Sequence, residues 1–134
     1  MTQEEKDLLL KDLCARLPYK VCAQIPDEYG GYTSAIESID IDGFVKDFEG
    51  TQIEIEYIKP YLFPLSSITI EQERELSKLG VSYCEYALHD DIQGLGIMVD
   101  EAYIFFEYCY KHHIDFLGLI DMGIAIDATG KNIY

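Results

Sequence analysis

The sequence is poor in the residues that most often carry a recognisable motif. It has no tryptophan, three histidines, four cysteines and four prolines in 134 residues. The cysteines (Cys14, Cys22, Cys84 and Cys109) are scattered without close pairing, which indicates neither a disulfide framework nor a paired-cysteine zinc motif. No apolar run approaches the roughly 20 residues of a membrane-spanning helix.

Basic residues are scarce as well. Ten Lys and Arg face 25 Asp and Glu, so the net charge is −15, and residues 25–58 alone hold nine acids against one lysine. Such a field repels nucleic acids and anionic membranes, and it attracts basic protein surfaces. We therefore expect a protein partner, with no direct nucleic-acid or membrane binding. The acidic opening segment 1–7 is unlike a signal peptide, which favours a cytoplasmic location.

Apolar residues, by contrast, are plentiful. They make up 49% of the chain, including eleven Tyr and six Phe. A chain of this length and composition can bury one core. We expect a single domain that covers residues 1–134.

The apolar periodicity predicts an α+β fold. An amphipathic helix over 4–16 is followed by four short strands over 20–25, 32–42, 44–48 and 51–58. Turn signals at Asp42-Gly43 and Glu49-Gly50 indicate an antiparallel meander. An SH3-like curled sheet is an alternative that the sequence leaves open.

Helices that cover this sheet are predicted in the second half of the chain. Thr69 and Gln72 fit a capping box for a helix over 70–79, which Gly80 would end. Asp100 is a suitable N-cap for a strongly apolar helix that runs to 113, and Asp115 for a short helix to 120. Further strands are predicted over 81–88, 96–99 and 124–126.

Residues 59–69, with the sequence KPYLFPLSSIT, separate the two halves. Because proline fixes φ and disfavours the α region at the residue before it, this segment is predicted to be a stiff, extended connector. It resembles a recurring segment of small uncharacterised proteins from gut anaerobic bacteria and their phages and mobile elements. Segments 8–19 (LLLKDLCARLPY), 112–120 (HHIDFLGLI) and 122–126 (MGIAI) resemble the opening and closing parts of those proteins. The resemblance implies a bacterial or phage setting and no particular activity.

Histidines near the end of the third helix raise the question of a metal. Cys109 and His113 lie one helical turn apart, with His112 and Asp115 close by. The further ligands would come from Cys84, His89 or Asp121, without the spacing of a zinc site. We therefore expect a buried cysteine, histidines that stabilise a helix C-terminus, and neither a metal nor another cofactor.

Four acids are the candidate binding residues. Asp40, Asp42, Glu54 and Glu56 are predicted on the polar face of neighbouring strands. With them, the chain is interpreted as a non-enzymatic accessory or protein-interaction protein without catalytic residues. The apolar helix over 100–113 is equally compatible with a homodimer interface.

Two other functions stay open. Residues two apart on a strand, such as Glu54 and Glu56, are spaced about 7 Å apart, as phosphates are along one nucleic-acid strand, which is compatible with an acidic DNA mimic. A small hydrolase that uses His89 or His112 is the other alternative. No Gly-x-Ser-x-Gly motif supports it, and the histidines are explained more simply by an exposed loop and a helix end.

Overall fold

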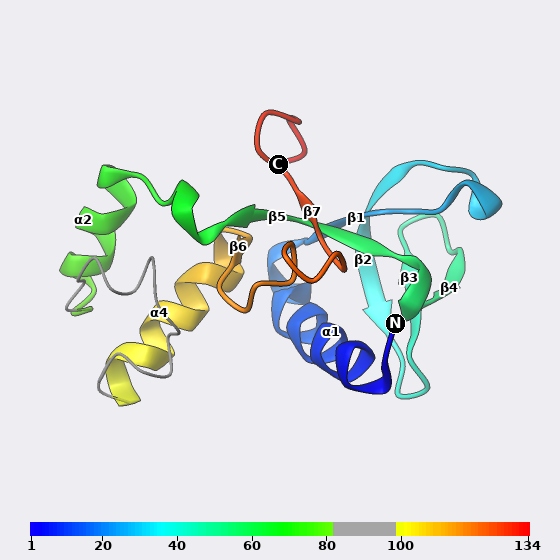
Figure 1. Cartoon of the computed structure of the whole chain (residues 1–134), viewed down its shortest axis with the longest axis horizontal. Helices are drawn as coiled ribbons and strands as arrows, with labels where there is room; N and C mark the ends of the chain where they lie inside the picture. The colour runs from blue at the N-terminus through cyan, green and yellow to red at the C-terminus, as the bar shows by residue number, and fades with distance from the viewer. Residues whose placement is uncertain (82–98) are drawn as a thin grey trace.

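A computed structural model describes residues 1–81 and 99–134, and it has the expected α+β architecture (Figure 1). The N-terminal helix α1 spans Gln3–Arg16 and begins with a capping box. The hydroxyl oxygen of Thr2 accepts the Glu5 N–H (3.1 Å), and the Glu5 carboxylate accepts the Thr2 N–H (2.9 Å). These two bonds satisfy amides that lack a partner inside the helix.

The first four strands form the predicted antiparallel meander, in the order β4-β3-β2-β1. They are β1 (Cys22–Gln24), β2 (Thr33–Ile39), β3 (Phe44–Asp47) and β4 (Gln52–Glu54).

All four strands are shorter than the sequence predicted, β2 and β4 by the most residues. β2 ends before the turn at 40–43 rather than at 42. The predicted strand over 51–58 stops at Glu54, opposite Phe44, the first residue of β3. The strand pairing with β3 ends there, and Ile55–Tyr57 form a 3-10 helix instead.

The prediction of a connector over 59–69 was wrong for its first half. Lys59–Pro64 form β5, a strand within the sheet. β5 pairs antiparallel with β1 through Ala23 and Pro60. It also pairs in parallel with two short strands from the end of the chain, β6 (Ile114–Asp115) and β7 (Ile126–Asp127).

The sheet is therefore mixed, with the order β4-β3-β2-β1-β5-β6 and with β7 also beside β5. Among the strands that the structure describes, no pairing joins β4 to β6. The described strands thus form an open path rather than a closed barrel.

Three further short 3-10 helices lie in connections between the longer elements: Leu17–Tyr19, Asp27–Tyr29 and Leu65–Ser67. The last one leads into α2 (Ile70–Lys78), whose capping box between Thr69 and Gln72 confirms the prediction. Gly80 follows α2 with a φ of +100°, the left-handed conformation expected after a helix.

The helix α4 spans Val99–Lys111, so the predicted helix to 113 was two residues too long. No helix follows at 115–120. The Asp115 carboxylate nevertheless accepts the N–H groups of Leu119 and Ile120, both at 2.9 Å, and so closes a turn in place of a helix. The strands predicted over 81–88 and 96–99 fall almost entirely on residues 82–98, outside the described ranges.

Buried side chains form two clusters. One lies between α1 and the sheet and includes Leu9, Leu13 and Leu62. The other joins α2, α4 and β6 and includes Leu76 and Phe105. In Figure 1, α2 and α4 lie at one end of the long axis, α1 and β1–β4 lie at the other, and β5 runs between the two ends.

Arg16 lies at the junction and is fully buried. Its Nε and Nη2 atoms donate to the two carboxylate oxygens of Asp12, which is equally buried (2.8 and 3.1 Å). Nη1 donates to the carbonyl oxygen of Cys109 in α4 (3.2 Å), and Nη2 to that of Ile114 in β6 (2.7 Å). One side chain of α1 thus satisfies backbone groups of the second cluster.

Candidate functional site

The acidic residues around the β2–β3 turn line a cleft of about 300 Å³, which we call the acidic cleft. The turn is tightened by Asp40, whose Oδ1 accepts the N–H groups of Asp42 (2.9 Å) and Phe44 (3.0 Å). Gly43 has a φ of +85°, which favours glycine. Its carbonyl oxygen accepts the Ile55 N–H (3.0 Å), and this bond holds the turn beside the residues that follow β4.

The first two turns of α1 form the opposite wall of the acidic cleft, through Gln3, Lys6, Asp7 and Leu10. Lys6 Nζ lies 2.8 Å from a carboxylate oxygen of Glu56. This hydrogen-bonded ammonium lowers the pKa of Glu56. The acids Asp7, Asp42 and Glu54 also line the cleft, so it remains anionic after the Lys6 pair is counted.

Of the four acids that the sequence indicated, three line the acidic cleft: Asp42, Glu54 and Glu56. Asp40 is close in sequence, but its carboxylate is engaged in holding the turn. The prediction that all four share the polar face of neighbouring strands was wrong, because Asp40 and Asp42 lie in the turn and Glu56 lies in a 3-10 helix.

Sequence reasoning missed the wall from α1 and one apolar residue. Ile41 lines the cleft and is 98% exposed, the most exposed large apolar side chain in the described part of the chain. The strand predicted over 32–42 includes Ile41. The Asp42-Gly43 turn signal could have corrected this, because a tight turn at 42–43 leaves residue 41 outside the paired strand.

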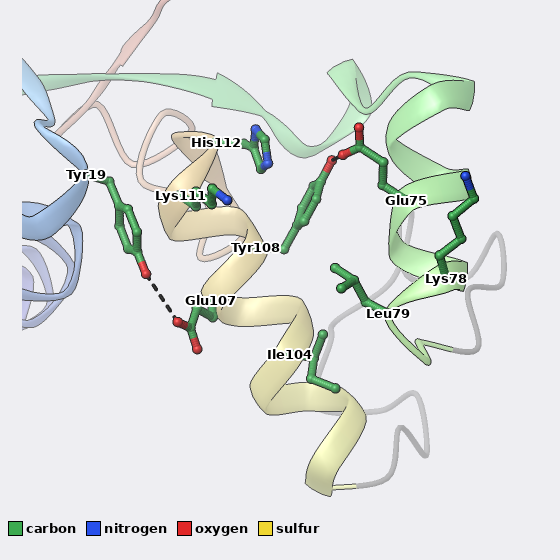
Figure 2. A pocket seen from close by; sticks show the side chains of 9 residues that line it. All are labelled: Tyr19, Glu75, Lys78, Leu79, Ile104, Glu107, Tyr108, Lys111 and His112. Atoms are coloured by element: carbon green, nitrogen blue, oxygen red, sulfur yellow. Dashed lines mark hydrogen bonds between the residues drawn. The ribbon is translucent and has the colours of Figure 1, made fainter.

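A second, larger cavity of about 570 Å³ lies between α2, α4 and Tyr19, and we call it the histidine cavity (Figure 2). Tyr108 projects from α4 toward α2, and its hydroxyl donates to Oε2 of Glu75 (2.7 Å). The His112 ring lies against the Tyr108 ring with centroids 4.2 Å apart. Across α4, the Tyr19 hydroxyl donates to Glu107 (3.2 Å).

The histidine cavity brings His112 close to a carboxylate, as a general base would require. Burial lowers the pKa of His112, although the Glu75 charge opposes this shift. Burial and the bond to Glu75 raise the pKa of Tyr108 far above its ordinary value, so its hydroxyl acts as a donor rather than as a nucleophile. Among the described residues that line the cavity, none is Ser, Thr or Cys.

Three of the side chains considered for a metal serve the fold instead. Cys109 is buried, and burial raises the pKa of its thiol to about 12. Asp115 binds two backbone amides, and the His113 ring stacks on Tyr134 with centroids 3.7 Å apart. Within residues 1–81 and 99–134, no group of three or more His, Cys, Asp or Glu side chains is arranged to hold a metal ion. His89 and Cys84 lie outside these ranges.

Comparison of the chain with protein-family models, with curated proteins and with solved structures found no match. In the part of the chain that the structure describes, no helix combines the length and hydropathy needed to cross a membrane. The case for a function therefore rests on the geometry of the residues themselves.

Proposed function

We propose that this chain is a non-enzymatic protein-interaction protein, and that the acidic cleft binds a basic segment of its partner. The observation that supports this most is the joining of Asp42 and Glu54 with the almost fully exposed Ile41 in one concave surface. A partner side chain with an ammonium or guanidinium head and an apolar stem fits both features.

The cleft supports this function better than net charge alone does. Charge spread evenly over a surface serves solubility and attracts any cation. In this protein the acids line the acidic cleft together with Ile41, an exposed apolar side chain that lowers solubility. Exposed apolar side chains beside a concave polar surface are typical of places where another molecule binds.

The alternatives have less support. The DNA-mimic hypothesis relied on strand spacing between Glu54 and Glu56, but only the first of these lies in a strand. The hydrolase hypothesis has a cavity around His112, but no described hydroxyl or thiol nucleophile other than tyrosine lines it. For a homodimer, the apolar face of α4 is largely used inside the chain, because Phe105 and Cys109 are buried in the second cluster.

The proposal is tested with short synthetic peptides in a fluorescence-anisotropy titration. One peptide combines lysine and leucine, and a matched peptide replaces each lysine with glutamate. We expect binding of the first peptide only. In the double variant Asp42→Asn and Glu54→Gln, binding should weaken roughly fivefold, since two exposed carboxylates each contribute about 0.5 kcal/mol.

The matched control is the double variant Glu28→Gln and Glu49→Gln, which removes the same charge from two exposed acids that do not line the cleft. Binding by this control should stay close to that of the unchanged protein. Equal losses in both double variants would show that the overall field, not the cleft, attracts the peptide. Ile41→Ser should weaken binding without changing its salt dependence, since it alters no charge.

A further inference from the structure

A third cavity differs in its charge from the others. It has a volume of about 470 Å³ and lies among β5, the start of α2, the end of α4 and the C-terminal residues 129–134. Lys111, His112 and His113 line it, and no described Asp or Glu does. We call it the basic cavity. The histidine cavity and the acidic cleft both include acids, as expected for a chain with 25 acids and ten bases.

Hydrogen-bond donors surround the basic cavity. Thr69 and Gln72 line it from the first turn of α2. The oxygen of the Gln72 side-chain amide accepts the Thr69 N–H, so its amide nitrogen is the atom that can donate to a ligand. The positive end of the α2 dipole also favours an anion at this place.

The C-terminus of α4 reaches the same cavity, and its carbonyl oxygens would repel an anion. Those carbonyls have partners. Arg16 donates to the Cys109 carbonyl oxygen (3.2 Å). The His112 N–H donates to that of Tyr108 (3.0 Å), and the His113 N–H to that of Tyr110 (3.3 Å). Their negative potential is therefore partly offset before any ligand binds.

His113 occupies a backbone conformation that glycine would adopt at lower cost, with a φ of +61° at the end of α4. Its ring lines the cavity together with the Tyr134 ring, on which it stacks with an interplanar angle of 9°. Its Nδ1 atom is buried and has no hydrogen-bond partner among the described residues. A left-handed histidine with an unsatisfied ring nitrogen costs stability, which is a common property of functional positions.

The volume indicates the size of the ligand. A cavity of about 470 Å³ falls in the volume range of sites for small organic molecules, and it is far larger than a bare inorganic oxyanion needs. Phe63 and Tyr134 provide an aromatic wall, with ring centroids 5.9 Å apart. We propose that the basic cavity binds a small organic oxyanion, with its phosphate or carboxylate group near Lys111 and its apolar part against Phe63 and Tyr134.

The test uses phenyl phosphate and its neutral counterpart phenol, each titrated into the protein at constant ionic strength. The ring C–H signals of His112 and His113 in NMR spectra report binding. We expect phenyl phosphate to shift both signals with a dissociation constant at least about tenfold lower than that of phenol, as one charge-assisted hydrogen bond implies. Equal affinities would refute the anion site.

Variants of Lys111, an exposed residue, locate the site without threatening the fold. Lys111→Gln should weaken the binding of phenyl phosphate about tenfold and leave the binding of phenol unchanged. Lys111→Arg should retain the affinity for phenyl phosphate. Lys46→Gln in β3 is the matched control, because it removes the same charge from an exposed residue that does not line the cavity. The proposal is wrong if Lys111→Gln binds as the unchanged protein does, or if Lys46→Gln weakens binding equally.

Discussion

Replacement of Arg16 by methionine should be among the most destabilising single changes in the chain. The guanidinium makes two bonds to Asp12 and one each to the carbonyl oxygens of Cys109 and Ile114. Its charged group also lies 5.3 Å from the centre of the Tyr110 ring. Arg16→Met keeps the length and apolar volume of the side chain and removes all of these interactions.

The expected cost is about 3–5 kcal/mol, because the change leaves the Asp12 carboxylate buried without its partner. Asp12 and Arg16 are 1% and 0% exposed, so solvent cannot replace the lost bonds without local opening. A domain of this size is stable by about 5–15 kcal/mol, so the variant should fold but unfold at much lower urea concentration.

The pH dependence gives an independent check. Burial already raises the pKa of Asp12, against the opposing effect of Arg16. Without Arg16 this pKa should rise further. An acid with a raised folded-state pKa contributes stability below its unfolded pKa, and this contribution is lost as pH rises through the folded pKa. The deficit of Arg16→Met should therefore be larger at neutral pH than in mild acid.

Two further variants complete the experiment. Asp12→Leu combined with Arg16→Met removes both charges and should recover part of the stability, since apolar residues often replace a buried pair without loss. Lys6→Met breaks the solvent-accessible pair with Glu56 and should cost little stability. If Arg16→Met costs no more than Lys6→Met in urea unfolding, Arg16 does not fasten α4 to α1 as argued above.

Three other predictions concern single residues. Burial lowers the pKa of His113 from 6.5 to about 4. Stability should therefore fall as pH falls through this window, by about 2 kcal/mol once the full linkage value of roughly 3 kcal/mol is reduced for solvent screening. An identical pH profile for His113→Asn would contradict this. The Tyr134 hydroxyl donates to the Tyr61 carbonyl oxygen (2.6 Å), so Tyr134→Phe should lower the stability in thermal unfolding by about 1–2 kcal/mol. Tyr103 is 69% exposed, so the control Tyr103→Phe should change the stability very little. Lys20 has a φ of +59°, so Lys20→Gly should raise the melting temperature, and a fall would refute the argument from backbone strain.

Local signals were the ones that the sequence predicted well. The capping box at Thr69 and Gln72, the glycine after α2 and the turn glycine Gly43 all follow from interactions within a few residues. The meander was likewise predictable, because neighbouring antiparallel strands are joined by short turns with recognisable residues.

Interactions between distant segments could not be read from the sequence. The two prolines of β5 argued against a strand, but Pro60 pairs with Ala23 and Pro64 with Asp115. Three different strands, β1, β6 and β7, pair with β5, and no sequence pattern near residues 59–64 predicts these partners. A basic residue at the end of a helix usually complements the helix dipole at the surface. Arg16 is buried instead, and two of its acceptors lie 93 and 98 residues away.

The candidate sites show the same division. The acids of the turn were found from their sequence because they are close together in the chain. The α1 wall of the acidic cleft comes from residues 3–10, and the basic cavity draws on β5, α2, α4 and residues 129–134. Only folding brings these segments together, so composition could indicate an anionic protein but not a cavity that Lys111 and two histidines line.

The acidic cleft and the basic cavity share no lining residue, because the first draws on the start of α1 and residues 41–56 and the second on β5, α2, the end of α4 and residues 129–134. Substitutions in one should therefore leave ligand binding at the other unchanged, because distant sites without shared partners behave additively. Arg16 is the exception that follows from its contacts. It belongs to α1, yet it satisfies the Cys109 carbonyl at the end of α4 and the Ile114 carbonyl at the edge of the basic cavity. Loss of Arg16 would leave these two carbonyl oxygens without their donor, so it should weaken anion binding in the basic cavity. The acidic cleft, formed by the other end of α1, should retain its affinity for the peptide.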